Sequence, residues 1–203
     1  MRARGTLIVF VKSPVAGRAK SRLGQEIGLG RAAAIFRHLT ATTLVHAAKS
    51  GAPLMIAIDP PSDLYGWRSL WPQRFRRLPQ AQGSLGERMR GAMRAADRGP
   101  VVIIGADAPA LRAHHLRHAF HALGAADAVF GPAADGGYWL VGLARRRAAP
   151  GALLDVRWST AHALADSIAS LPRDFRIDFL PVLGDIDHAA DLSAAGPLLR
   201  SAR

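Results

Sequence analysis

The sequence predicts an α/β fold in which helices cover both faces of a mainly parallel central sheet. Three observations support this prediction. Short apolar runs alternate with longer stretches of helical periodicity, no linker or internal repeat interrupts the alternation, and 203 residues are enough for one hydrophobic core. We therefore expect a single domain spanning residues 1–203. The composition, with 49% hydrophobic and 21% charged residues, is that of a globular chain.

Strands are predicted where short apolar runs lie between turn residues. These runs are Thr6–Val11, Leu54–Ile58, Val101–Ile104, Ala128–Phe130, Tyr138–Val141 and the extended segment Phe175–Val182. Helices are predicted where apolar residues recur every three or four positions. These segments are Arg31–Lys49, Leu85–Ala96, His114–Leu123 and Ala161–Ala169, with a final helix near the end of the chain. In such sheets ligands bind at the carboxyl ends of the strands, so we expect binding residues directly after the strands.

The composition also limits the classes of function. The chain has 27 lysines and arginines against 15 aspartates and glutamates, a net charge of +12. This charge would attract polyanions, although arginines scattered over solvated faces explain such an excess equally well. Cysteine is absent, which excludes disulfides, a thiolate nucleophile and a zinc–cysteine site, and favours a cytoplasmic location. The apolar run Leu7–Val11 is far shorter than the ~20 residues of a membrane span, so no membrane partner is expected.

A basic segment after the first strand is the first candidate site. Residues 1–25 contain no acidic residue, and the segment that leaves the first strand carries four cations and one glycine, namely Lys12, Arg18, Lys20, Arg22 and Gly17. Ammonium and guanidinium groups suit phosphate oxygens, and glycine permits close approach of the backbone to a ligand. We interpret the segment as a phosphate-binding loop, the alternative being a solvated basic loop. The spacing of a Walker A loop is absent, so the mechanism of P-loop NTPases does not apply.

Aspartates near the ends of two other segments could hold a divalent metal. Asp107 follows the strand Val101–Ile104, and Asp185 and Asp187 flank Ile186 near the end of the chain. In an extended segment both carboxylates would lie on the face opposite Ile186. Mg²⁺ or Mn²⁺ takes oxygen ligands, so we predict a site formed by Asp107 and Asp187, with Asp185 as an alternative second ligand. The competing interpretations are a turn role for Asp107 and a helix N-cap role for Asp187.

The remaining motifs carry weaker signals. Gly136 and Gly137 suggest a tight turn or close approach to a ligand, and Tyr138 and Trp139 should point to opposite faces of a strand. Ser159 or Thr160 is a candidate cap for the following helix. Three histidines at helical spacing could imitate a metal site, but they fall opposite the apolar stripe of their helix and are predicted to be solvated; these are His114, His118 and His121.

Taken in order, these segments resemble a bacterial family of uncharacterised glycosyltransferase-like proteins in the nucleotide-diphospho-sugar transferase superfamily, also described as radical-SAM- and selenium-associated transferases. The resemblance spans nearly the whole chain. It rests on Lys12-Ser13-Pro14, Gly17-Arg18, Lys20-Ser21-Arg22-Leu23, Gly83-Ser84-Leu85-Gly86-Glu87-Arg88-Met89, Gly105-Ala106-Asp107-Ala108-Pro109, Gly131-Pro132-Ala133, Asp135-Gly136-Gly137-Tyr138, Trp158-Ser159-Thr160 and Asp185-Ile186-Asp187.

The resemblance implies a Rossmann-like GT-A fold, a crevice for a nucleotide diphosphate, and a divalent metal held by Asp107 and Asp187. It also brings Arg88 into the expected donor-binding set. Ser84 stands where the family often has an acidic residue, and Ala106 and Ala108 replace Ser and Cys, but neither change removes a charge from the metal site. The Asp-x-Asp motif of many GT-A glycosyltransferases is absent. The Lys20–Leu23 segment, Asp107 before proline and the terminal Asp-x-Asp are also similar to the 2-phospholactate guanylyltransferases.

The sequence therefore predicts a metal-dependent transferase that uses a nucleotide or nucleotide-sugar donor and a small-molecule acceptor. Asp107, Lys20 and Arg22 are the predicted catalytic residues, with Lys20 and Arg22 on the donor phosphates. Glycosyl transfer is the preferred reaction, and nucleotidylyl transfer with release of pyrophosphate is the alternative. A nucleotide- or RNA-binding protein without catalysis is the third possibility. Few aromatic residues accompany the basic segment, so nucleic acid is not the expected partner.

Overall fold

In the computed structural model of the chain, which describes residues 5–200, one seven-stranded sheet forms the centre of the molecule. Arg2 and Arg4, which belong to the acid-free stretch 1–25, lie outside the described residues. The strands are β1 (Thr6–Lys12), β2 (Leu54–Asp59), β3 (Arg76–Pro79), β4 (Val101–Ile104), β5 (Ala128–Pro132), β6 (Tyr138–Leu143) and β7 (Ile177–Phe179). Their order across the sheet is β3-β2-β1-β4-β6-β5-β7.

The sheet is mainly parallel, and β6 is its exception. Strand β6 pairs antiparallel with β4 on one side and with β5 on the other, while the other neighbouring pairs are parallel. The chain passes from β1 outward through β2 and β3, then returns to place β4 on the other side of β1. The carboxyl ends of β1 and β4 therefore lie side by side at a point where the strand order reverses, which is where doubly wound sheets bind ligands.

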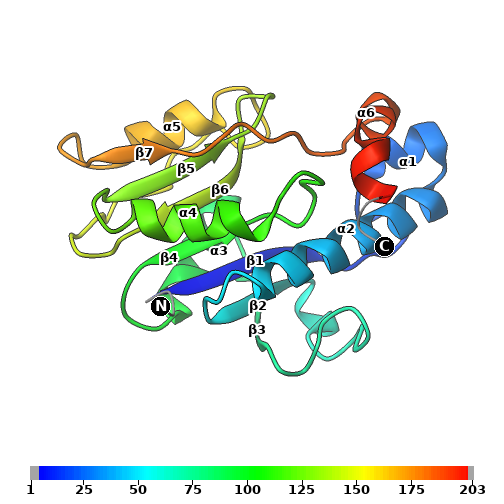
Figure 1. Ribbon diagram of the computed structural model, residues 1–203, viewed down its shortest axis with the longest axis horizontal. Helices are drawn as coiled ribbons and strands as arrows, with labels where there is room; N and C mark the ends of the chain where they lie inside the picture. The colour runs from blue at the N-terminus through cyan, green and yellow to red at the C-terminus, as the bar shows by residue number, and fades with distance from the viewer. Residues whose placement is uncertain (1–4, 201–203) are drawn as a thin grey trace.

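Helices cover both faces of this sheet, as predicted. They are α1 (Ser21–Ile27), α2 (Leu29–Ala48), α3 (Leu85–Ala95), α4 (Ala113–Ala122), α5 (Ala163–Ala169) and α6 (Ala189–Arg200), with a short 3₁₀ turn at Pro61–Asp63. Helices α2 and α4 lie on the near face in Figure 1, and α1 and α6 lie side by side at the end toward which β1 runs. Among the described residues, no helix is both long and apolar enough to cross a membrane.

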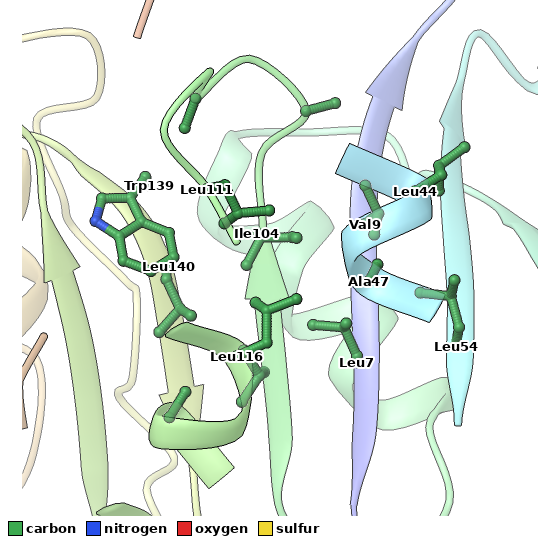
Figure 2. Close-up of a cluster of buried hydrophobic side chains, with 14 of the residues drawn as sticks. Leu7, Val9, Leu44, Ala47, Leu54, Ile104, Leu111, Leu116, Trp139 and Leu140 are labelled. Carbon is green, nitrogen blue, oxygen red and sulfur yellow. The ribbon is translucent and has the colours of Figure 1, made fainter. Parts of the chain in front are cut away.

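Alternation along the strands divides the core into two layers. Leu7 and Val9 face α2 and α4, whereas Ile8 faces α3 on the opposite side. Figure 2 shows the first layer, where Leu44 of α2 packs over β1 and β2 and Leu116 of α4 packs over β4. The predicted opposition of two aromatic residues is confirmed, because Tyr138 packs into the layer of α3 and Trp139 into that of α4.

Several local predictions required correction. Strand β3 and helix α1 were not predicted, since β3 contributes only four residues and α1 begins inside the basic segment. The antiparallel direction of β6 was likewise not predicted. Thr160 accepts the N–H of His162 but makes no cap bond to α5, which begins at Ala163. The three histidines predicted to be solvated, His114, His118 and His121, are indeed exposed.

Candidate functional site

A crevice of about 370 Å³ opens where β1 and β4 end. Its walls come from the segment after β1, the start of α1, helix α3, the loop after β4 and the segment before α6. All five predicted phosphate-binding cations and both predicted metal ligands line it, namely Lys12, Arg18, Lys20, Arg22, Arg88, Asp107 and Asp187. Segments far apart in the sequence therefore meet at the topological switch point of the sheet.

Three carboxylates converge in this crevice. Asp107 follows β4 directly, while Asp185 and Asp187 arrive on the segment that precedes α6. One oxygen of each lies within 4.8 Å of the others. Between Asp185 and Asp187, Ile186 is fully buried in a cluster with Leu23 of α1 and with Ala32 and Leu39 of α2. Ile186 thus anchors the segment, and the aspartates on either side of it reach Asp107.

The helix-cap alternative for Asp187 does not describe this arrangement. Helix α6 begins at Ala189, two residues later, and the carboxylate of Asp191 accepts the backbone N–H groups of Asp187 and His188. In addition, Glu26 of α1 accepts the N–H of Ala189 and lies 2.6 Å from the ring of His188. These bonds hold the start of α6, and the side chain of Asp187 is left to face the crevice.

Lys20 bridges two of the three carboxylates. Its Nζ donates to Asp107 Oδ2 at 2.8 Å and to Asp187 Oδ1 at 2.6 Å, and its side chain is only 5% exposed. The residue adopts a left-handed backbone conformation (φ 53°, ψ 49°) immediately before α1, which few non-glycine residues adopt. The geometry therefore sets an ammonium group between the carboxylates that were expected to share a metal ion. Arg22 Nη1 is 3.9 Å from Asp187 and remains largely exposed.

The charges in this cluster perturb one another. Burial, followed by the charge of Asp107, raises the pKa of Asp185. Burial also opposes ionisation of Asp187, but the hydrogen bond and charge of Lys20 outweigh it and hold the pKa of Asp187 below its usual value. Burial by itself would lower the pKa of Lys20, yet its two carboxylate partners raise it. Lys20 is thus a fixed cation, while Asp185 carries a charge that no described basic group contacts as a salt bridge.

The other cations of the crevice come from β1, from the loop that follows it and from α3. Lys12 ends β1 and Arg18 lies in the following loop, where both side chains are exposed. Arg88 Nη1 is 3.4 Å from Asp59, which ends β2, and Arg88 Nε is buried without a partner in the described part of the chain. Gly17 has φ 83°, so the basic loop needs glycine there for its turn.

Gly136 and Gly137 lie away from this crevice, in the turn between β5 and β6. A Cβ atom at Gly136 would stand 2.2 Å from the carbonyl oxygen of Ala161, and the backbone there has φ 83°. Gly137 donates its N–H to the carboxylate of Asp135. Within the described structure these glycines serve the turn and its packing against the segment before α5, and a ligand role for them stays a prediction.

Two residues were missed from the sequence, namely Gln80, which lines the crevice, and Asp59, which contacts Arg88 in its wall. Gln80 follows β3 and is buried, with its amide donating to the carbonyl oxygens of Val11 and Ala57. Because β3 was not predicted, nothing in the sequence marked Gln80 as a residue at a strand end. Asp59 directly follows the predicted strand Leu54–Ile58, so its position at a strand end could have marked it in the same way as Asp107.

The chain matches one known protein family. Residues 42–160, more than half of the chain, match the family described as "Uncharacterized protein conserved in bacteria (DUF2064)". The chain belongs to the DUF2064 family. The matched region of this DUF2064 protein includes Asp107 and Arg88, whereas Lys20 and Asp187 lie outside it. No curated protein sequence matches the chain.

Solved structures show the same fold over the whole chain. A protein from Desulfovibrio desulfuricans G20, whose name assigns it provisionally to the nucleotide-diphospho-sugar transferases, is 28% identical, covers 98% of this chain and 97% of its own, and has a TM-score of 0.83. Rv0371c from Mycobacterium tuberculosis H37Rv, in a complex with manganese, is 17% identical with 97% and 98% covered and a TM-score of 0.57. The inositol-1-phosphate CTP transferase of T. maritima is 10% identical with 100% and 97% covered and a TM-score of 0.61. The GT-A-like fold predicted from the sequence is thereby confirmed.

Proposed function

We propose that this protein is a divalent-metal-dependent transferase that binds a nucleotide-activated donor in the crevice and transfers a sugar from a nucleotide-diphospho-sugar. One observation carries the proposal. Three carboxylates meet at the switch point of the sheet, where Lys20 bridges two of them and arginines and a lysine line the surrounding wall. Carboxylates and cations that share a crevice suit a ligand that brings a metal ion together with phosphates.

The carboxylate set fits a hard divalent cation. Its ligand atoms are oxygens from three short side chains that lie within 4.8 Å of one another, and both Mg²⁺ and Mn²⁺ prefer oxygen ligands. Charge supports the same conclusion, because a single buried ammonium does not balance three carboxylates. Asp107 and Asp187 would hold the ion, and Asp185, the third carboxylate of the cluster, would be an additional ligand. When bound, such an ion neutralises negative charge on the donor's phosphates.

Cationic side chains of the protein would neutralise the rest of the negative charge on the donor's phosphates. Arg18 and Arg22 are exposed at the mouth of the crevice, where their guanidinium groups can donate to phosphate oxygens. Arg88 lines the same crevice and lies 3.4 Å from the carboxylate of Asp59, so its guanidinium group is a further donor for phosphate oxygens. Fixed donors of this kind stabilise the charge that develops on a leaving nucleoside diphosphate. Lys20 would contribute from between the carboxylates, as the cation nearest to the metal ligands.

Two observations bear on which bond breaks. The solved structure at 28% identity carries the name of a nucleotide-diphospho-sugar transferase, which supports glycosyl transfer. The number of cations around the crevice supports nucleotidylyl transfer, because a pyrophosphate leaving group needs more charge neutralisation than a diphosphate ester does. We propose glycosyl transfer first and nucleotidylyl transfer second.

The products of the reaction test this choice. The purified protein is incubated with MgCl₂, an acceptor pool from a cell extract, and panels of nucleotide-sugars and nucleoside triphosphates, and nucleoside diphosphate and pyrophosphate are assayed separately. We expect acceptor-dependent release of a nucleoside diphosphate. Pyrophosphate from a triphosphate, with no diphosphate from any nucleotide-sugar, would replace glycosyl transfer with nucleotidylyl transfer.

A pair of matched variants ties the activity to the crevice. Asp107→Asn removes one carboxylate charge and should abolish either activity, whereas Asp155→Asn removes one from an exposed loop position without a described side-chain partner and should leave it unchanged. Asp155 has φ 53°, a conformation that asparagine tolerates well. Equal activity in the two variants would contradict the metal site. Tight, metal-independent binding of nucleotide or RNA with neither product released would leave a binding protein on a transferase fold.

A further inference from the structure

A second cavity lies at the opposite end of the sheet from the crevice. It has a volume of about 330 Å³, within the usual size of small-molecule sites. Leu143, which lines it, ends β6 and pairs with Val101 and Ala128, the first residues of β4 and β5. The crevice lies beyond the other ends of these strands. The two sites are therefore separated by the length of the sheet.

The floor of this cavity is apolar. Met93 of α3, Leu143 and Ala152 line it, and each is less than a tenth exposed on the surface of the protein as a whole. Phe175 forms another part of the wall, with the guanidinium of Arg147 stacked 4.9 Å from its ring centroid. A ligand that enters would cover hydrocarbon and one aromatic ring, so the interior favours a compact apolar body.

The rim of the cavity carries cations without carboxylate partners. Arg90 donates from Nη1 to the carbonyl oxygens of Pro150 and Ala152, each at 2.7 Å, and Arg145 donates to the carbonyl oxygen of Asp97 at 2.8 Å. These bonds fix the two guanidinium groups without neutralising them. Arg94 is exposed, and no salt bridge is found for it, Arg90 or Arg145 among the described residues.

The single carboxylate in the lining does not balance this charge. Asp127 is 11% exposed and is already engaged by Arg146 at 3.9 Å, by Arg147 at 3.4 Å and by the backbone N–H of Arg176. Arg147 is in turn paired with Asp174. Positive charge thus remains at the mouth of an apolar cavity, a combination that disfavours a neutral apolar ligand and a bare inorganic anion alike.

We propose that this cavity binds a small amphipathic organic anion, whose apolar body contacts Met93, Leu143 and Phe175 and whose acidic group is held by Arg90, Arg94 and Arg145. The anionic group is a carboxylate or a phosphate monoester, since the N–H groups of a guanidinium donate to the oxygens of both. The site is separate from the donor crevice and does not depend on the function proposed for it.

Three probes separate the apolar and charged contributions. 2-Naphthoate and 2-naphthyl phosphate carry both features, 2-naphthol carries the ring alone, and inorganic phosphate carries the charge alone. In calorimetric titrations we expect saturable binding of one of the two naphthyl anions, and binding of 2-naphthol and phosphate weaker by at least about tenfold, because each lacks one kind of contact. The tighter of the two anions identifies the acidic group.

Charge-matched variants assign the binding to this cavity. Arg94→Gln changes an exposed helix position, so the fold should survive, and it should weaken binding of the better anion by about tenfold. Arg31→Gln on α2 and Arg22→Gln in the crevice remove the same charge elsewhere and should leave binding unchanged. Loss of binding in Arg22→Gln but not in Arg94→Gln, equal binding of 2-naphthol, or no saturable binding of either anion would each overturn the proposal.

Discussion

Replacing Lys20 with methionine tests how the carboxylates of the crevice respond to the loss of their ammonium. Lys20 Nζ bonds to Asp107 Oδ2 and Asp187 Oδ1, two of the oxygens that a divalent cation would use. Methionine keeps most of the length of the buried side chain and removes only the charge and the donors. We expect the Lys20→Met variant to bind Mn²⁺ more tightly than the unchanged protein, even though Lys20 is itself a predicted catalytic residue.

The magnitude follows from the two bonds that a metal ion must compete with. A hydrogen bond to a charged group contributes about 1.5–3 kcal/mol. Because the two aspartate side chains are 34% and 37% exposed, the lower end of this range applies to each bond. Since about 1.4 kcal/mol corresponds to a factor of ten, we expect Mn²⁺ affinity to rise between about tenfold and a hundredfold.

The assay is calorimetric or electron paramagnetic resonance titration with Mn²⁺ at constant pH and salt. Lys12→Met is the control, because Lys12 lines the same crevice and has no salt bridge within the described residues. Without metal, Lys20→Met should also melt at a lower temperature, since it leaves three carboxylates facing one another, and Mn²⁺ should restore the loss. Unchanged or weaker Mn²⁺ binding in Lys20→Met would refute the reasoning, and absence of binding in every form would instead remove the metal site.

Two further predictions concern stability. Gly86→Ala should destabilise the protein by about 1–3 kcal/mol, because the added Cβ would stand 2.0 Å from the backbone carbonyl oxygen of Leu153. Gly91→Ala in the same helix should be neutral or stabilising, because its Cβ would meet its nearest atom at 3.4 Å. Urea unfolding gives the free energy of both variants, and equal losses would contradict the packing argument. The hydrogen bond that the His188 ring donates to the Glu26 carboxylate raises the pKa of His188 above its ordinary 6.5. The stability that this ion pair contributes is therefore present below pH 6.5 and lost as the pH rises through the folded-state pKa. His188→Gln should therefore lower Tm more at pH 5.5 than at pH 9, with the exposed His121→Gln as control, and a loss independent of pH would rule out this ion pair as the cause.

Local patterns were sufficient for most of the framework. Apolar runs such as Val101–Ile104 and helical periodicity such as that of Arg31–Lys49 arise because the element is buried on one or both faces. Such patterns involve only residues that are close together in the sequence, so they can be recognised without the structure. Strand β3 was not predicted because two of its four residues are arginines. The four residues form a strand only because they pair with β2. The direction of β6 also depended on its neighbours, since a run of six residues reads the same way in either orientation.

The candidate site, like the fold, was predicted from the sequence only in part. The sequence by itself identified Asp107 and Asp187 as acidic residues at segment ends, and Lys20 as part of a basic loop, because residue type and proximity to a strand end are local properties. Only the tertiary structure decided that Lys20 binds those two aspartates, which are 87 and 167 positions away along the chain. Pairing over such distances depends on the path of the chain between the segments and on the burial of Ile186, which brings the last of them to the crevice. Energies of charged contacts depend on distance and solvent exposure, and neither quantity exists until the chain has folded.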